Sequence, residues 1–97
     1  MSWEELVASV TDDHPDLQPG KMFGRPCLKR ANGKVVATHW KDGGITVKLT
    51  DEAVREEALG LEGAELFDPG MGRTMKEWVL VPEAQSARWR DLVERAI

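Results

Sequence analysis

The sequence predicts one α+β domain in which an antiparallel sheet of about five strands packs against three helices. Three observations support this: an amphipathic stretch near each end, an Asn-Gly dipeptide between two extended runs, and strict alternation over 45–49. The chain has 97 residues, which suits a single domain, 1–97, with one modest core. The predicted order of elements is α-β-β-β-α-β-β-α.

The first element is predicted to be a helix from Ser2 to about Val10. Its apolar residues share one helical face: Trp3, Leu6, Val7 and Val10. Ser2 and Glu5 have the spacing of a capping box, in which each side chain accepts from the backbone N–H of the other residue. The next stretch, 11–20, contains two prolines and a glycine, so we expect a loop or a broken turn there.

Three strands are then predicted, over 27–31, 34–40 and 45–49. Asn32-Gly33 separates the first two, and this dipeptide favours a tight hairpin because both residues tolerate positive φ. In the third strand the apolar residues alternate with Thr46 and Lys48, which we expect to point outward. Together the strands predict a three-stranded antiparallel meander.

The second half of the chain predicts a helix, two strands and a final helix. The helix over 50–60 begins with acidic residues, which its dipole favours, and is capped by Thr50 or Asp51. A short strand over 64–67 and a longer one over 74–81 follow. Pro82 suits the first position of the last helix, because a missing N–H costs nothing there.

Composition and charge favour a cytoplasmic protein. The formal net charge is −4, which argues against a large nucleic-acid footprint. Cys27 is the single cysteine, so no internal disulfide is expected. No apolar run reaches the ~20 residues that span a bilayer, and the N-terminus lacks the basic leader of a signal peptide.

The sequence offers no recognisable catalytic set, so we expect no catalytic residues and no enzymatic activity. Cys27 with His14 or His39 is the one combination of nucleophile and base, and a small buried role is the favoured reading of Cys27. The histidines and the cysteine lack metal-ligand spacing, so no metal and no cofactor are expected. Residues 70–73 contain a Gly-x-Gly, but no helix follows it, and the glycines are better explained by the tight connection after Pro69.

Basic residues gather in the predicted strands and the segments that flank them, whereas acidic residues fall largely in the helices. The cations are Lys21, Arg25, Lys29, Arg30, Lys34, Lys48, Arg73 and Lys76. A solvated sheet face with lysines that guard strand edges is the favoured interpretation. An anion-binding or partner-binding region remains the alternative. The candidate interaction surface comprises Arg25, Lys48, Arg73, Lys76, Trp40 and Trp78.

Several motifs resemble the TfoX N-terminal domain family over residues 5–97. They are Lys21-Met22-Phe23-Gly24, the run Gly44-Ile45-Thr46-Val47-Lys48-Leu49, and the closing segment from Phe67 to Pro82 with Arg73-Thr74-Met75-Lys76-Glu77-Trp78. The YjbR-like small α+β domains are a similar alternative. The resemblance implies an α+β fold with a central antiparallel sheet and a link to regulation of competence genes. It carries no catalytic residues. The name-giving proteins have a second, helical domain, and here Arg25-Pro26-Cys27 replaces the usual glycine-rich continuation.

The sequence therefore favours a non-enzymatic interaction or regulatory module that binds a protein partner or a second copy of itself. Two alternatives stay open. One is nucleic-acid binding through the basic sheet region, and the other is a small anionic ligand near Gly70–Lys76. No membrane association is expected.

Overall fold

The computed structural model of the chain describes residues 1–22, 24–40, 43–68, 72 and 75–97. Its helices are α1 (Trp3–Asp13), α2 (Glu52–Leu59), the 3₁₀ segment η2 (Glu83–Arg88) and α3 (Trp89–Ala96). Its strands are β1 (Gln18–Met22), β2 (Arg25–Lys29), β3 (Val35–His39), β4 (Ile45–Lys48), β5 (Glu65–Phe67) and β6 (Met75–Val81). The predicted α+β class is confirmed, with one more strand than expected.

All strands belong to one antiparallel sheet in the order β1-β2-β3-β4-β6-β5. The additional strand is β1, Gln18–Met22. Its first residues lie at the end of the stretch 11–20, where we predicted a loop or a broken turn. Pro19 does not prevent this strand because β1 lies at the edge of the sheet, where a proline without an N–H leaves no ladder bond unmade. The order is thus α-β-β-β-β-α-β-β-α.

The capping box of α1 is confirmed. The Ser2 hydroxyl accepts from the Glu5 backbone N–H at 3.1 Å, and the Glu5 carboxylate accepts from the Ser2 N–H at 3.2 Å. The helix continues to Asp13, beyond the predicted end. Asp51, rather than Thr50, caps α2 by accepting from the N–H groups of Ala53 and Val54.

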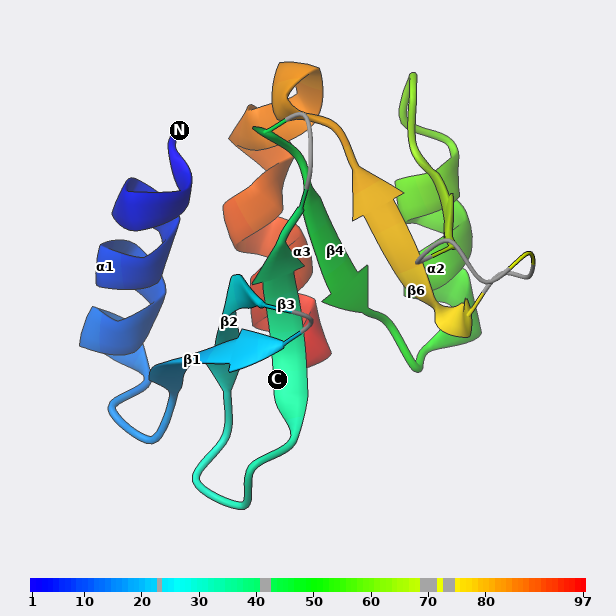
Figure 1. Cartoon of the computed structure of the whole chain (residues 1–97). Coiled ribbons are helices and arrows are strands. Elements are labelled where there is room, and N and C mark those ends of the chain that lie inside the picture. Colours follow the sequence, from blue (N-terminus) through cyan, green and yellow to red (C-terminus); the bar gives the residue numbers. More distant parts are fainter. Residues whose placement is uncertain (23, 41–42, 69–71, 73–74) are drawn as a thin grey trace.

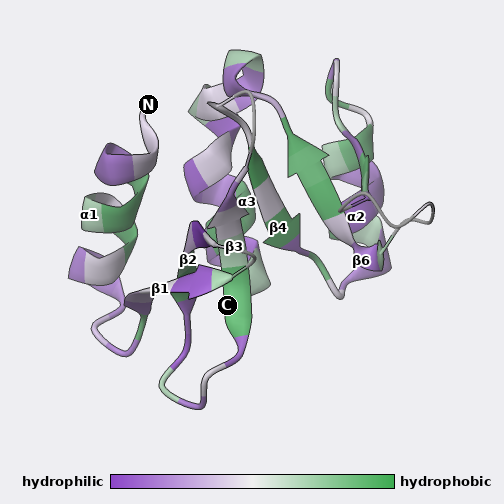
Figure 2. Ribbon diagram, in the orientation of Figure 1, coloured by the Kyte–Doolittle hydropathy of each residue, from purple (hydrophilic) through white to green (hydrophobic). Residues whose placement is uncertain are grey.

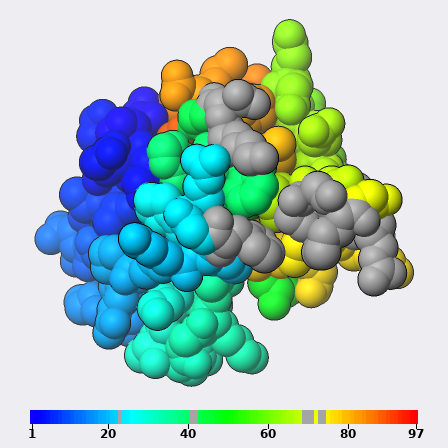
Figure 3. Space-filling model, in the orientation of Figure 1, coloured from blue at the N-terminus to red at the C-terminus, as the bar shows by residue number. Residues whose placement is uncertain are grey.

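The Asn32-Gly33 hairpin is confirmed as the connection between β2 and β3. The Arg30 N–H donates to the Lys34 carbonyl at 2.8 Å, and Gly33 has a φ of 86°. A glycine suits this position because a side chain would strain the left-handed backbone. In Figure 3 the hairpin projects at the lower edge of the molecule.

The last helical segment is divided, where a single helix was predicted. Pro82 precedes the 3₁₀ segment η2, and α3 begins only at Trp89. Gln85 leaves the helical region at φ −103°, ψ 20°, and its side-chain amide donates to the Glu62 carbonyl at 3.2 Å. The break therefore occurs where the chain is tied to the loop after α2.

The helices cover one face of the sheet, and the main core lies between them. Figure 1 shows α2 and α3 behind the strands and α1 beside α3. The core joins helix and strand residues: Trp3, Leu6, Val10, Leu17, Leu28, Val36, Ala37, Ile45, Val47, Leu49, Ala58, Val79, Val81, Trp89, Leu92 and Val93. Figure 2 shows the apolar colouring of β4 and β6 that this arrangement buries. The predicted core tryptophans Trp3 and Trp89 are both buried.

A second, smaller set of buried residues lies on the face without helices. Cys27, Phe67 and Trp78 are buried outside the main core cluster, together with Thr38 and Thr46. Thr46 was expected to face solvent. This prediction is wrong, because Thr46 is fully buried although it lies on the face of β4 opposite to Ile45 and Val47. We call this face of the sheet the helix-free face.

No helix in the described ranges is both long and apolar enough to cross a membrane.

Candidate functional site

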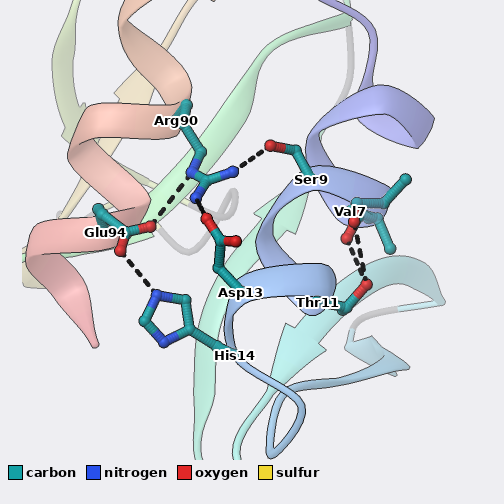
Figure 4. A network of polar contacts seen from close by, with 8 residues as sticks. Val7, Ser9, Thr11, Asp13, His14, Arg90 and Glu94 are labelled. Atoms are coloured by element: carbon teal, nitrogen blue, oxygen red, sulfur yellow. Dashed lines mark hydrogen bonds and ion pairs between the residues drawn. The ribbon is translucent and has the colours of Figure 1, made fainter.

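Ion pairs join the helices on the outer side of the domain. Arg90 of α3 is central to them, because its guanidinium bonds Ser9 and Asp13 of α1 as well as Glu94 of its own helix (Figure 4). Glu94 also contacts His14 Nε2 at 2.6 Å. A second group links Arg88 and Arg95 to Glu57 of α2 and to Asp91. These ion pairs join the helices to one another, and each charged group named here already has a partner.

The network changes the proton affinities of its members. The hydrogen bond with His14 lowers the pKa of Glu94, and the bond with Arg90 adds to this effect. The bond with Asp13 raises the pKa of Arg90. These hydrogen bonds and ion pairs are therefore strongest while Glu94 is ionised. We interpret them as a structural contact rather than an acid–base pair, and we call the group Ser9, Asp13, His14, Arg90 and Glu94 the clasp between α1 and α3.

A row of polar side chains crosses the helix-free face. The register places Cys27 opposite Thr38, and Thr38 opposite Thr46. Both threonine hydroxyls are buried, and within the described residues neither has a hydrogen-bond partner. Burial raises the pKa of the Cys27 thiol, an effect that the charge of Lys29 partly offsets. The prediction that Cys27 is a small buried residue is confirmed, and a protonated, buried thiol is a poor nucleophile.

Two aromatic contacts lie on the same face. The Trp40 ring meets Phe67 edge-on, with centroids 4.7 Å apart, and the Arg25 guanidinium lies over Trp40 at 6.0 Å. Trp40 is half-buried and Arg25 is half-buried. A cation over an indole face is attracted by the ring quadrupole, which favours this position of the Arg25 side chain.

The predicted interaction surface is partly assembled. Strand register makes Lys48 and Trp78 direct neighbours on β4 and β6. Trp78 is only 8% exposed, so it serves packing more than contact. Lys76 is exposed. Arg73 lies outside the described residues, as does most of the predicted ligand loop Gly70–Lys76, of which the structure describes Gly72, Met75 and Lys76.

His39 has a packing role that the sequence left open. Its ring stacks on Trp3 with centroids 5.5 Å apart and planes 8° from parallel. It lies on the helix side of the sheet, whereas Cys27 lies in the row on the other face. The two side chains are therefore not arranged as a nucleophile and its base.

The structure contains a basic pocket that the sequence did not identify as a unit. It has a volume of about 250 Å³ and lies where the β2–β3 hairpin meets the ends of β4 and α3. Its lining residues are Arg30, Asn32, Lys34, Val35, Val36, Lys48, Thr50 and Ala96. The Asn-Gly turn already implied that Arg30 and Lys34 are neighbours across the hairpin. No comparable local sequence pattern predicted the pairing of β3 with β4, which places Lys48 and Thr50 in the same pocket.

Among the residues that the structure describes, no group of three or more His, Cys, Asp or Glu side chains is placed to hold a metal ion. Comparisons with protein-family models, with curated proteins and with solved structures found no match to the chain. The resemblance to the TfoX N-terminal domain family therefore stays a prediction.

Proposed function

We propose that this domain is a non-enzymatic interaction module that binds an acidic surface of a partner protein through the helix-free side of its sheet. The observation that carries the proposal is the separation of charge. Arg88, Arg90 and Arg95 of the last two helical segments are all in ion pairs. Arg55 of α2 instead donates to the Leu49 carbonyl. Within the described chain, Arg25 and Lys48 on the sheet are in none.

The surface chemistry also favours a charged partner over an apolar one. Across the described ranges, Met1 is the one large apolar side chain that is exposed, at 44%. An interface on this domain therefore depends on polar and aromatic contacts. Arg25 over Trp40 supplies an arginine and a tryptophan side by side, the residue types that most often dominate binding energy at interfaces.

The resemblance to the TfoX family implies the same class of function, a regulatory module without catalytic residues. A role in competence regulation belongs to the same proposal. Nucleic-acid binding remains a second candidate because the same cations would contact phosphates, and its affinity would fall steeply with salt.

The test is to immobilise the domain and to pass cytosol of its source cell over it, with and without nuclease treatment of the cytosol. The proteins or nucleic acids that the domain retains are then identified. We expect the wild type to retain a discrete protein that survives nuclease. The double variant Arg25→Glu/Lys48→Glu should lose it, because two cations become anions. Lys21→Glu is the control, since Lys21 is exposed on the edge strand β1, opposite Pro26, and is not one of the groups in the Arg25–Trp40 contact.

Two results would contradict the proposal. Equal retention by the double variant would remove this surface from binding. Recovery that disappears after nuclease treatment would identify nucleic acid as the ligand. The melting temperatures of all variants should stay close to that of the wild type, which excludes unfolding as the cause of a lost interaction.

A further inference from the structure

The basic pocket at the hairpin end of the sheet has the composition of an anion site. Three of its lining residues, Arg30, Lys34 and Lys48, are cations, and none is acidic. They come from the end of β2, the hairpin and β4, so the fold gathers them from separate parts of the chain. The end of α3 contributes Ala96 to the lining, and α3 contacts β3; in Figure 1 the label of the C-terminus lies over β3.

The cations keep donors available for a ligand. One guanidinium nitrogen of Arg30 donates to the Ala96 carbonyl at 3.1 Å, which fixes the side chain and offsets the partial negative charge at the end of α3. The remaining Arg30 N–H groups have no partner among the described residues. Lys34 and Lys48 are in no ion pair there. Three positive charges that repel one another thus line one small concavity, and none of the residues that line it has a carboxylate side chain.

Neutral donors and an apolar wall complete the pocket. The Asn32 side-chain oxygen accepts from the Lys34 backbone N–H at 3.0 Å, so the amide nitrogen remains as the free donor of that group. Thr50 contributes an exposed hydroxyl. Val35 and Val36 form an apolar side of the pocket.

Size and charge select the ligand class. At about 250 Å³ the pocket is below the ~300–1,000 Å³ typical of sites for larger organic ligands, so it suits a small group. A single carboxylate would be satisfied by one arginine fork, whereas a dianionic group with several acceptor oxygens matches three cations and two neutral donors. We infer that the pocket binds a phosphate group, as inorganic phosphate or as a phosphomonoester.

The pocket shares Lys48 with the proposed partner-binding surface, but its other lining residues do not include Arg25 or Trp40. The distinguishing residues are Lys34 and Thr50, which lie away from the Arg25–Trp40 contact. Loss of phosphate binding through Lys34 therefore leaves the partner proposal intact, and failure of the partner proposal leaves the phosphate site intact.

The experiment is an NMR titration of the ¹⁵N-labelled domain with inorganic phosphate and, in a second arm, with phenyl phosphate, at constant ionic strength. We expect saturable shifts of backbone amides in 30–36 and 48–50. Lys34→Met should raise Kd about tenfold, the equivalent of one charge-assisted hydrogen bond, and Thr50→Val should raise it about threefold. Tighter binding of the ester would indicate a phosphorylated molecule as the ligand, and tighter binding of inorganic phosphate would indicate the free ion.

The matched control is Lys21→Met, which removes the same charge from an exposed position on β1 outside the pocket. It should change Kd by less than about twofold, because screened charges at a distance contribute little. Non-saturating shifts spread over many cations would overturn the inference. So would equal effects of Lys21→Met and Lys34→Met, or binding of malonate as tight as that of phosphate. The dispersed spectrum of each variant reports directly that it is folded.

Discussion

Charged residues lie on both the helix-covered side and the helix-free side of the sheet, but among the described residues only on the first are arginines paired with carboxylates. On the helix-covered side, Arg88, Arg90 and Arg95 are paired with carboxylates of the helices, and the strands beneath bury apolar side chains. On the other side and at the hairpin end, lysines and arginines lack carboxylate partners in the described chain, and two threonine hydroxyls are buried without partners. The contrast supports the proposal that the second region, rather than the first, binds a partner.

The largest expected effect lies in the main core. Leu92 of α3 is completely buried, so Leu92→Ala should lower the free energy of unfolding by about 2–5 kcal/mol, through lost apolar contact and a residual cavity. Urea denaturation followed by tryptophan fluorescence measures this change. Arg95→Ala, on the exposed side of the same helix, is the control and should cost less than about 1 kcal/mol. A loss below about 1 kcal/mol for Leu92→Ala would mean that the core does not depend on α3.

An effect of opposite sign is expected on the helix-free face. Thr46→Val removes a buried hydroxyl that has no partner among the described residues, so the free energy of unfolding should stay unchanged or rise by up to about 1 kcal/mol. The same denaturation experiment measures it, with the exposed Thr50→Val as control. A clear destabilisation by Thr46→Val would show that this hydroxyl is satisfied in solution, and the contrast between the two faces would weaken.

The smallest effect concerns the charges between α1 and α3, and it depends on pH. The pKa of Glu94 is lowered in the folded state, so its contribution to stability is present above the ordinary glutamate pKa and is lost as pH falls through the lowered value. Glu94 is 38% exposed, so we expect less than about 1 kcal/mol. Unfolding free energies from pH 7 to pH 3 should fall less for Glu94→Gln than for the wild type. Parallel pH profiles for both proteins would exclude this contribution.

Local signals in the sequence predicted the elements that local chemistry determines. The capping box of Ser2 and Glu5, the Asn32-Gly33 hairpin and a strand within 45–49 are reproduced, although Thr46 of that strand is buried rather than exposed. The strand β1 was missed because its proline and glycine indicate a turn, and only pairing with β2 makes it extended. The break at Gln85 likewise depends on a contact with Glu62, 23 positions away.

The candidate site was less predictable because it depends on the order of the strands. Sequence patterns identified Lys48 and Trp78 but not that they are opposite one another, nor that Trp78 is buried. They identified Arg30 and Lys34 as basic residues but did not predict that Lys48 lines the same pocket. Each of these facts follows from pairing between β3, β4 and β6, which alternation within a single strand does not specify.

The clasp between α1 and α3 has a consequence for synthesis of the chain. Ser9 and Arg90 are 81 positions apart, so at about 5–20 residues per second a ribosome makes α3 roughly 4–16 s after α1. During that interval the apolar face of α1, with Trp3, Leu6 and Val10, lacks the helix that completes its cover. The nascent chain therefore carries the apolar residues of α1 without their full cover until the last helix has been made.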